Sequence, residues 1–312
     1  MATPLSTPFT DLVGCRLPLQ QAGMAGVATP ELAVAVADAG ALGMLAMPMA
    51  PPEMVAAALS AIEARTTGTV GMNFLMPFLD PACLAAAADK ARVIEFFYQQ
   101  PDATVVEVAH RGGALAAWQV GSVDEARAAV DAGCDFVIAQ GVEAGGHVRG
   151  TVGMLTLLEE VLAAVDVPVV AAGGIGTARD VSVALAAGAG GVRVGTRFLA
   201  ADEADVHPEY LARLIGADAI DTVLTEKFSV MWPNAPHRVL RSAIEEANAF
   251  EGDIVGEATF GDSRMPVPRF SVPCPTRSTT GAIGAMALYA GESVGAVQRR
   301  QPAAEIVREL MG

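Results

Sequence analysis

The chain has 312 residues, a formal net charge of −15 at pH 7 and a hydrophobic fraction of 52%. Its length fits either one α/β barrel or two ordinary domains, and its acidity makes nucleic acid and anionic membrane surfaces unfavourable partners. No apolar stretch reaches the roughly 18 to 20 residues that span a bilayer, and the N-terminus lacks a signal-peptide layout, so we expect a soluble, cytoplasmic protein.

From the N-terminus, short apolar runs alternate with segments of helical spacing. The predicted strands are 17–22, 41–46, 69–74, 93–97, 114–119, 135–140, 168–172 and 191–194, and the predicted helices between them are 30–39, 51–65, 81–92, 101–111, 122–132, 154–165 and 177–187. Helix starts are recognisable, as where Ser122 precedes Glu125 in the pattern of a capping box. Short strands that are apolar on both faces are typical of a parallel sheet covered by helices. The repeated unit favours a TIM (β/α)8 barrel, with an open doubly wound sheet as the alternative.

The regular alternation lapses between Ala201 and Pro275, where prolines interrupt the chain and one helix is predicted over 238–250. This pattern predicts a small inserted cap domain after strand 8. We therefore expect a barrel made of 1–200 plus 276–312 and a cap or substrate-side domain at 201–275. Helices at 279–289 and 302–311 would then complete the chain. In the cap, Phe228 and Trp232 either form a lid over the barrel mouth or pack together as an ordinary aromatic pair.

TIM barrels carry their chemistry at the C-terminal ends of the strands. The residues at those ends are rich in amides and glycine: 21–24, Asn73, Tyr98, Gln119, 140–149, 173–174 and 195–196. Side-chain amides and bare backbone suit a polar planar ring system. The four cysteines are dispersed and form no cluster with histidine, so no metal site is expected.

Two glycine junctions follow the seventh and eighth predicted strands. Many barrels bind a phosphate group there, because backbone N–H groups without a Cβ in the way can all point at one anion. Gly173, Gly174 and Gly195 therefore predict a phosphate site. The same glycines would also serve a purely structural role in tight turns.

His147 is the candidate catalytic residue, because it follows a predicted buried strand and the flexible pair Gly145-Gly146. An imidazole with an ordinary pKa near 6.5 can remove a proton from carbon beside an electron-withdrawing group. A histidine on a surface loop with no catalytic role is the alternative. Glu143 is either a second acid or base or an ordinary hydrogen-bonding group.

The run Gln140-Gly141-Val142-Glu143-Ala144-Gly145-Gly146-His147, followed by 171–175 and 192–198, resembles the nitronate monooxygenase family, formerly called 2-nitropropane dioxygenases. The resemblance extends from Gln21 to Gly291 and implies a TIM barrel with a small extra domain, non-covalent FMN and His147 as the catalytic base. The flavin-lining residues that it implies are Ala22, Gly23, Met24, Asn73 and Gln119. The phosphate ligands that it implies are Gly173, Gly174, Gly195 and Thr196. Gln140, Gly145, Gly146 and Ala172 complete the expected cofactor site.

The resemblance implies FMN-dependent oxidation of small nitroalkanes or nitronates with O2. These small molecules are the expected partners, with no nucleic acid and no membrane, and a homo-oligomer is a possible assembly. Relatives that share the barrel perform hydride chemistry, so an NAD(P)H-dependent flavin reductase of quinones or enoyl thioesters is the alternative function. A non-catalytic flavin-binding protein is a third and different class of answer.

Overall fold

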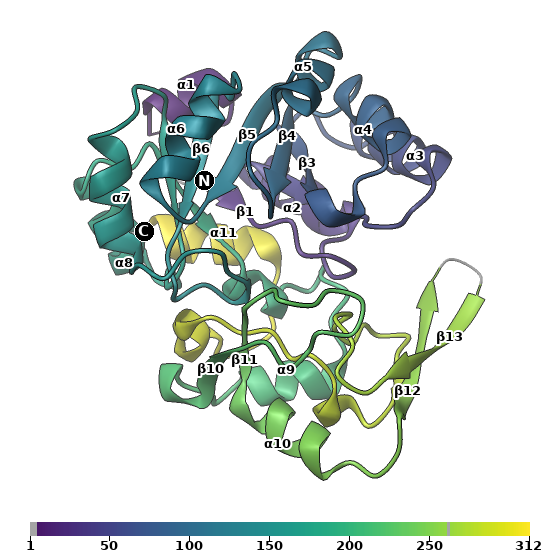
Figure 1. Ribbon diagram of the computed structural model, residues 1–312. Helices are drawn as coiled ribbons and strands as arrows, with labels where there is room; N and C mark the ends of the chain where they lie inside the picture. The colour runs from purple at the N-terminus through teal and green to yellow at the C-terminus, as the bar shows by residue number, and fades with distance from the viewer. Residues whose placement is uncertain (1–4, 261–262) are drawn as a thin grey trace.

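A computed structural model describes residues 5–260 and 263–312, and its larger part is a barrel of eight parallel strands (Figure 1). In sheet order the strands are β1 (Leu19–Gln21), β9 (Gly191–Val194), β8 (Val169–Ala172), β6 (Phe136–Gln140), β5 (Leu115–Val120), β4 (Val93–Phe97), β3 (Val70–Leu75) and β2 (Gly43–Leu45). The barrel closes where Leu42 N donates to Leu19 O at 2.9 Å and Gln21 N donates to Leu42 O at 3.0 Å. The predicted TIM barrel is therefore confirmed.

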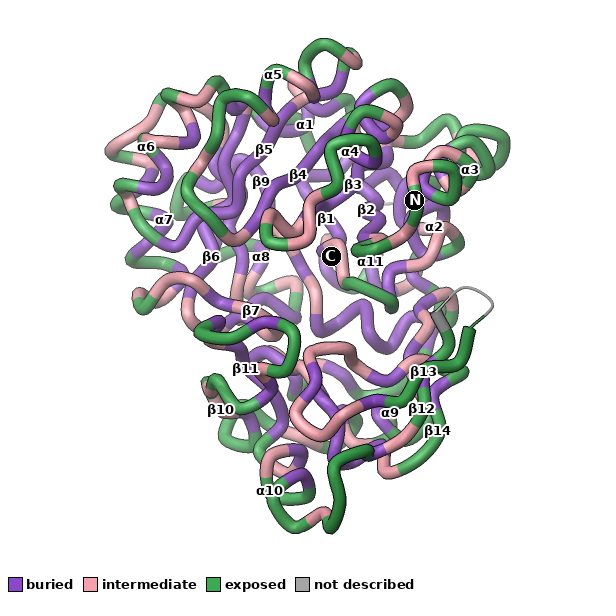
Figure 2. Tube along the Cα trace, turned by 45° about the vertical axis from the view of Figure 1, so that its right-hand side comes forward, coloured by how far each residue is buried: buried purple, intermediate pink, exposed green. Residues whose placement is uncertain are grey.

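Helices surround the barrel, so the strands are buried while the outer helix faces are exposed (Figure 2). They are α2 (Pro30–Ala39), α3 (Pro52–Glu63), α4 (Pro81–Ala88), α5 (Ala103–Arg111), α6 (Val123–Asp131), α7 (Met154–Leu162), α8 (Ala178–Ala186) and α11 (Ala303–Met311). A short helix that the sequence did not predict, α1 (Pro8–Val13), fills the N-terminal end of the barrel, where the Phe9 and Phe136 ring centroids are 5.4 Å apart. With that end filled by apolar side chains, the opposite end is the open mouth.

Local sequence signals explain most helix starts. Thr29 accepts from Leu32 N at 3.0 Å immediately before Pro30, which is the expected combination of cap and N1 proline. Ser122 likewise accepts from Glu125 N at 3.2 Å. The predicted capping box is nevertheless incomplete, because the Glu125 carboxylate accepts from Gly121 N at 2.8 Å and pairs with Arg149.

A second unit lies beside the barrel mouth, below the barrel in Figure 1. It contains η2 (Thr196–Ala200), α9 (Pro208–Leu214), η3 (Ala219–Asp221), β10 (Thr222–Thr225), β11 (His237–Leu240), α10 (Arg241–Ala249), β12 (Ile254–Phe260), β13 (Ser263–Pro268), β14 (Thr280–Gly281), η4 (Ile283–Ala285) and η5 (Glu292–Ala296). One sheet has the order β10-β11-β7, where β7 (Gly146–His147) belongs to the loop after β6. The predicted inserted cap after the eighth barrel strand, which is β9, is therefore present, and its strand β11 pairs directly with the candidate catalytic loop.

Two predicted helices differ from the structure. The first three residues of the predicted helix 238–250 belong to strand β11, and only Arg241–Ala249 is helical. The predicted helix at 279–289 is wrong: Gly281 has φ +114°, which an α-helix does not allow, and its strand pairs with β12. The helix that completes the barrel is α11, which packs on α2 and α8. Because β14 pairs with β12, part of the chain after 276 also contacts the second unit, and the division at 201–275 stays a proposal.

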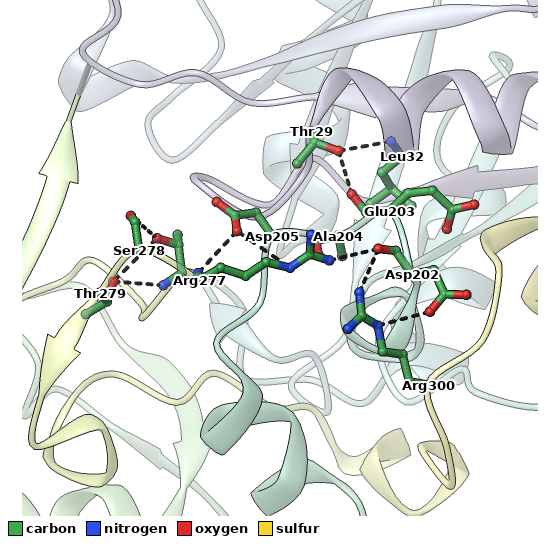
Figure 3. Close-up of polar contacts among 11 residues, drawn as sticks. Thr29, Leu32, Asp202, Glu203, Ala204, Asp205, Arg277, Ser278, Thr279 and Arg300 are labelled. Atoms are coloured by element: carbon green, nitrogen blue, oxygen red, sulfur yellow. Dashed lines mark hydrogen bonds and ion pairs between the residues drawn. The ribbon is translucent and has the colours of Figure 1, made fainter. Parts of the chain in front are cut away.

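A polar network connects the segments where the chain leaves the barrel for the second unit and returns from it (Figure 3). The Arg277 guanidinium donates to the carbonyl oxygens of Asp202 at 2.8 Å and Ala204 at 2.7 Å. Arg300 donates to the same Asp202 oxygen at 3.0 Å, and Thr29 at the start of α2 donates to Glu203 O at 2.7 Å. The outgoing and returning segments are thus fixed to one another and to the barrel. Among the described residues, no helix is long and apolar enough to cross a membrane.

Candidate functional site

Three buried side-chain amides lie toward the barrel mouth, two on the adjacent strands β5 and β6 and one on β3, beyond β4. Asn73 lies on β3, Gln119 on β5 and Gln140 on β6, and each is at most 5% exposed. Gln140 Nε2 donates to His147 O at 3.1 Å, while the Oε1 atoms of Gln119 and Gln140 have no hydrogen-bond partner within 5–260 and 263–312. Unpaired buried acceptors are costly. A polar ligand at this mouth could satisfy both acceptors.

The loop after β6 places His147 at the same mouth. Gly146 adopts φ +75°, and His147 pairs in register with His237 of β11. Val148 N then donates to Pro236 O at 2.8 Å. The flexible glycine turn is visible in the sequence, whereas the strand of the second unit that holds it is not. His147 thus sits between the barrel and the cap.

The environment of His147 keeps its imidazole neutral. Burial, and next the nearby His237, lower the pKa of His147 from 6.5 to about 3. Its Nε2 is buried, and neither ring nitrogen makes a hydrogen bond to any residue that the structure describes. Since the neutral imidazole can accept a proton at Nε2, His147 has the form required of a base at neutral pH.

Aromatic side chains enclose His147. Trp232 and Tyr98 contact its ring, and Phe78 contacts Trp232. Trp232 stacks on His147 with ring centroids 4.0 Å apart and an interplanar angle of 18°. Tyr98 and Phe78 present edges to Trp232 at 4.7 Å and 5.2 Å. Phe228, in contrast, packs toward Phe270 and His237 at 5.9 Å and 6.1 Å. Of the two cap aromatics, therefore, Trp232 covers the mouth and Phe228 belongs to the packed interior of the cap.

Glu143 has a hydrogen-bonding role in this structure. Both carboxylate oxygens accept from Met154 N at 3.0 Å, at the start of α7. The N-cap residue there is Gly153, which has no side chain of its own to accept from the helix. Glu143 consequently supplies the missing cap from the preceding loop.

The glycines of the predicted cofactor site are required by close approaches. A Cβ on Gly23 would lie 2.6 Å from Asn73 Cβ, and a Cβ on Gly145 would lie 2.4 Å from Gly291 N. Ala22 is the nearest neighbour of Gly195, at 3.4 Å from the position of its absent Cβ. These contacts bring the loop after β1, the loop after β6 and the loop after β9 together. Met24 packs against the core as a half-buried side chain, and Ala172 is buried on β8.

The predicted phosphate residues lie at the ends of β8 and β9. Gly173 and Gly174 have φ of +106° and +70°, so both need glycine. They line a cavity of about 450 Å³ together with Arg179 and with the carboxylate residues Glu143, Asp180 and Glu292. Thr196 Oγ1 accepts from Gly291 N at 3.0 Å, which leaves its hydroxyl hydrogen free to donate. The β8 junction thus offers backbone N–H groups, and the β9 junction adds the Thr196 hydroxyl.

A charged network inside the barrel was not identified from the sequence. Glu95 on β4 is fully buried, and its carboxylate accepts from Asn73 Nδ2 and from Arg193, each at 2.7 Å, and from Gln20 Nε2 at 2.5 Å. This arrangement fixes which way the Asn73 amide faces, because Nδ2 points to Glu95 and Oδ1 is left free. Single charges within the apolar runs Val93–Phe97 and Gly191–Val194 were the signal that could have found it.

Comparisons with known proteins agree with this geometry. A family model described as nitronate monooxygenase matches residues 6–86 and 82–312. A curated relative, the (3aS,4S,5R,7aS)-5-hydroxy-7a-methyl-1-oxo-octahydro-1H-indene-4-carboxyl-CoA dehydrogenase of Rhodococcus jostii (strain RHA1), is 35% identical over 257 residues, which cover 81% of this chain and 70% of that protein. FabK from Thermotoga maritima superposes with a TM-score of 0.80 at 29% identity, covering 98% of this chain and 95% of that one. Nitroalkane oxidase from Streptomyces ansochromogenes superposes with a TM-score of 0.78 at 29% identity, covering 97% and 96%.

Proposed function

The chain belongs to the nitronate monooxygenase family, and on that premise we propose that it oxidises small nitroalkanes and their nitronates with O2, with His147 as the base. It is a flavin oxidoreductase, and its cofactor is FMN. When bound, FMN would supply the redox chemistry, as the group that accepts electrons from the substrate and can be reoxidised by O2. The substrate and the roles of individual residues are the proposed part.

The residues at the mouth fit FMN. The partnerless Oε1 atoms of Gln119 and Gln140 are acceptors of the kind that a flavin ring N–H requires. Asn73, Ala22, Gly23 and Met24 would line the ring system, and Gly145 and Gly146 would let the backbone approach it. Backbone N–H groups at Gly173, Gly174 and Gly195 and the Thr196 hydroxyl would hold the phosphate. This solution needs no lysine and suits an acidic protein.

The observation that carries the proposal is the buried, partnerless Nε2 of His147. Because the pKa of His147 is lowered to about 3, the imidazole is neutral before the substrate arrives. Nε2 then removes the α-proton of a neutral nitroalkane, and the C–H electron pair remains on the substrate as the nitronate. The new imidazolium is stabilised by the adjacent nitronate charge, since opposite charges attract strongly away from water. A nitronate formed beforehand needs no such step.

Hydride chemistry on the same barrel is the second candidate, because the dehydrogenase relative is 35% identical and FabK superposes with a TM-score of 0.80. An NAD(P)H-dependent reductase must hold the phosphates of a dinucleotide. Four arginines of the second unit could do so: Arg238, Arg241, Arg264 and Arg269. All four already have protein partners. Arg238 donates to Val142 O and pairs with Glu292, and Arg241 donates to Thr222 O. Arg264 pairs with Glu257, and Arg269 donates to Phe250 O. The buried Arg238, held by two partners, is not free for a dinucleotide phosphate, which supports the nitronate, whereas the exposed Arg264 pair carries little weight.

Replacement of His147 by Asn tests the proposed base. We expect kcat/KM for a neutral nitroalkane to fall by about 100-fold to 10,000-fold, the usual contribution of a general base. Turnover of the nitronate prepared in advance should change much less, because no proton must be removed. Equal losses on the two substrates would show that His147 binds or orients the substrate without acting as a base.

A further inference from the structure

A catalytic histidine usually keeps its orientation through a hydrogen bond from its second ring nitrogen to a carboxylate or carbonyl group. His147 has no such bond to any residue of 5–260 or 263–312. The nearby His237 cannot provide one, because its Nδ1 donates to Ala235 O at 2.8 Å and its Nε2 accepts from Phe228 N at 3.2 Å. The imidazole of His147 is therefore held by packing alone.

The packing on His147 is unequal. Trp232 is the near-parallel partner, with centroids 4.0 Å apart and planes 18° from parallel. Tyr98, His237 and Tyr289 have centroids 6.0 Å, 5.2 Å and 5.6 Å from His147 at angles of 87°, 54° and 49°. Edge and tilted contacts at these distances limit the space into which the His147 ring can move. A stacked ring, in contrast, fixes the plane of its partner.

Trp232 is itself firmly placed. It is 5% exposed, and Tyr98 and Phe78 contact it edge-on from the barrel side. Tyr98 adopts φ +70°, a left-handed conformation that a non-glycine residue occupies only when its surroundings require it. On the cap side, Trp232 N donates to Ser229 O at 3.0 Å. The stack thus connects the barrel wall, the cap segment and the base.

We propose that Trp232 is the positioning residue of His147: its stacked indole sets the plane of the imidazole and so orients the ring toward the substrate, in place of a hydrogen bond to the ring. This inference rests on the proposed role of His147 as a base. It makes the cap part of the catalytic arrangement, because the segment between β10 and β11 supplies the group that orients a residue of the barrel loop.

The first test compares flavin-loaded Trp232→Phe and Trp232→Leu with the unaltered protein, on a neutral nitroalkane and on its preformed nitronate. Trp232→Leu should lose about 10-fold or more in kcat/KM on the nitroalkane, because a misaimed base is inefficient, and no more than about 2-fold on the nitronate. Trp232→Phe, which keeps a stacking ring, should recover most of the loss. Phe228→Leu is the matched control, since Phe228 lies in the same cap segment without contacting His147, and it should resemble the unaltered protein on both substrates.

A double variant separates positioning from general damage to the fold. When His147 is already Asn, Trp232→Leu should cause no further loss on the nitroalkane, because the two residues act as one unit. A further loss in that background, or equal losses on nitroalkane and nitronate, would overturn the proposal.

The second test does not depend on the substrate. In protein with ¹³C-labelled histidine, NMR relaxation and pH titration report the mobility and pKa of the His147 ring. We expect Trp232→Leu to make the ring more mobile and to raise its pKa from about 3 toward the ordinary value, and Trp232→Phe to do neither. Unchanged mobility and pKa in Trp232→Leu would overturn the positioning role. If the unaltered protein oxidises neither substrate, the proposed function fails, and this measurement still decides whether Trp232 controls His147.

Discussion

Replacing His147 by Asn should flatten the acid-side pH dependence of stability. Burial lowers the pKa of His147 from 6.5 in the unfolded chain to about 3 in the native protein, so between these pH values the unfolded chain binds a proton that the native protein does not. Stability therefore falls as the pH falls from 6.5 toward about 3, and no His147 penalty remains above pH 6.5. The slope is about 1.4 kcal/mol per pH unit, which amounts to a penalty of about 2 kcal/mol at pH 5.

Urea unfolding of the flavin-loaded protein and of His147→Asn, at pH 5.0 and pH 7.5 with the same FMN concentration, measures this penalty. The difference between the two proteins at pH 7.5 reports packing alone, because His147 is neutral in both states there. Between pH 7.5 and pH 5.0 the unaltered protein should lose about 2 kcal/mol more than the variant. Parallel losses in the two proteins would refute the assignment of a neutral, desolvated His147. His237, whose pKa burial also lowers, is present in both proteins and cancels.

Two other outcomes are expected. The denatured protein should release FMN in a one-to-one ratio on chromatography, because the predicted phosphate junctions close the end of the ligand; stoichiometric FAD would contradict this. Glu95→Gln should destabilise the protein by about 3 kcal/mol or more in urea unfolding, because it leaves the Arg193 charge buried without its partner. The double variant Glu95→Gln/Arg193→Gln should recover most of that loss, and failure to recover would mean that the ion pair is not the cause.

The strand and helix order of the barrel could be predicted because local signals agree with the final fold. The run Val93–Phe97 is β4 at the predicted bounds, since β-branched and aromatic residues favour a buried strand. The predicted helix 177–187 is followed directly by Gly188, whose φ of +102° is the left-handed conformation that ends a helix. In such places the residues within a segment are sufficient to predict its secondary structure.

Long-range contacts explain what sequence reasoning missed. The segment 279–289 is rich in alanine and reads as a helix, yet Gly281 pairs with Gly256 of β12 in an extended strand. Likewise, nothing local in the chain places Trp232 on His147, because that stack needs the pairing of β11 with β7. The glycine turn and the histidine of the site were visible in the sequence, and the group that orients the histidine was not.

The most direct test of the proposed function is anaerobic mixing of the oxidised, FMN-loaded protein with a nitronate such as that of 2-nitropropane. The nitronate should change the flavin spectrum rapidly, whereas NADH or NADPH at the same concentration should do so slowly or not at all. The reason is positional, because hydride transfer needs the nicotinamide at roughly 3 to 3.5 Å from the flavin, and Arg238, the buried arginine of the second unit, is already held by Val142 O and Glu292. Rapid reduction by NADH with turnover of a quinone or an enoyl thioester, and no response to the nitronate, would contradict the proposed function.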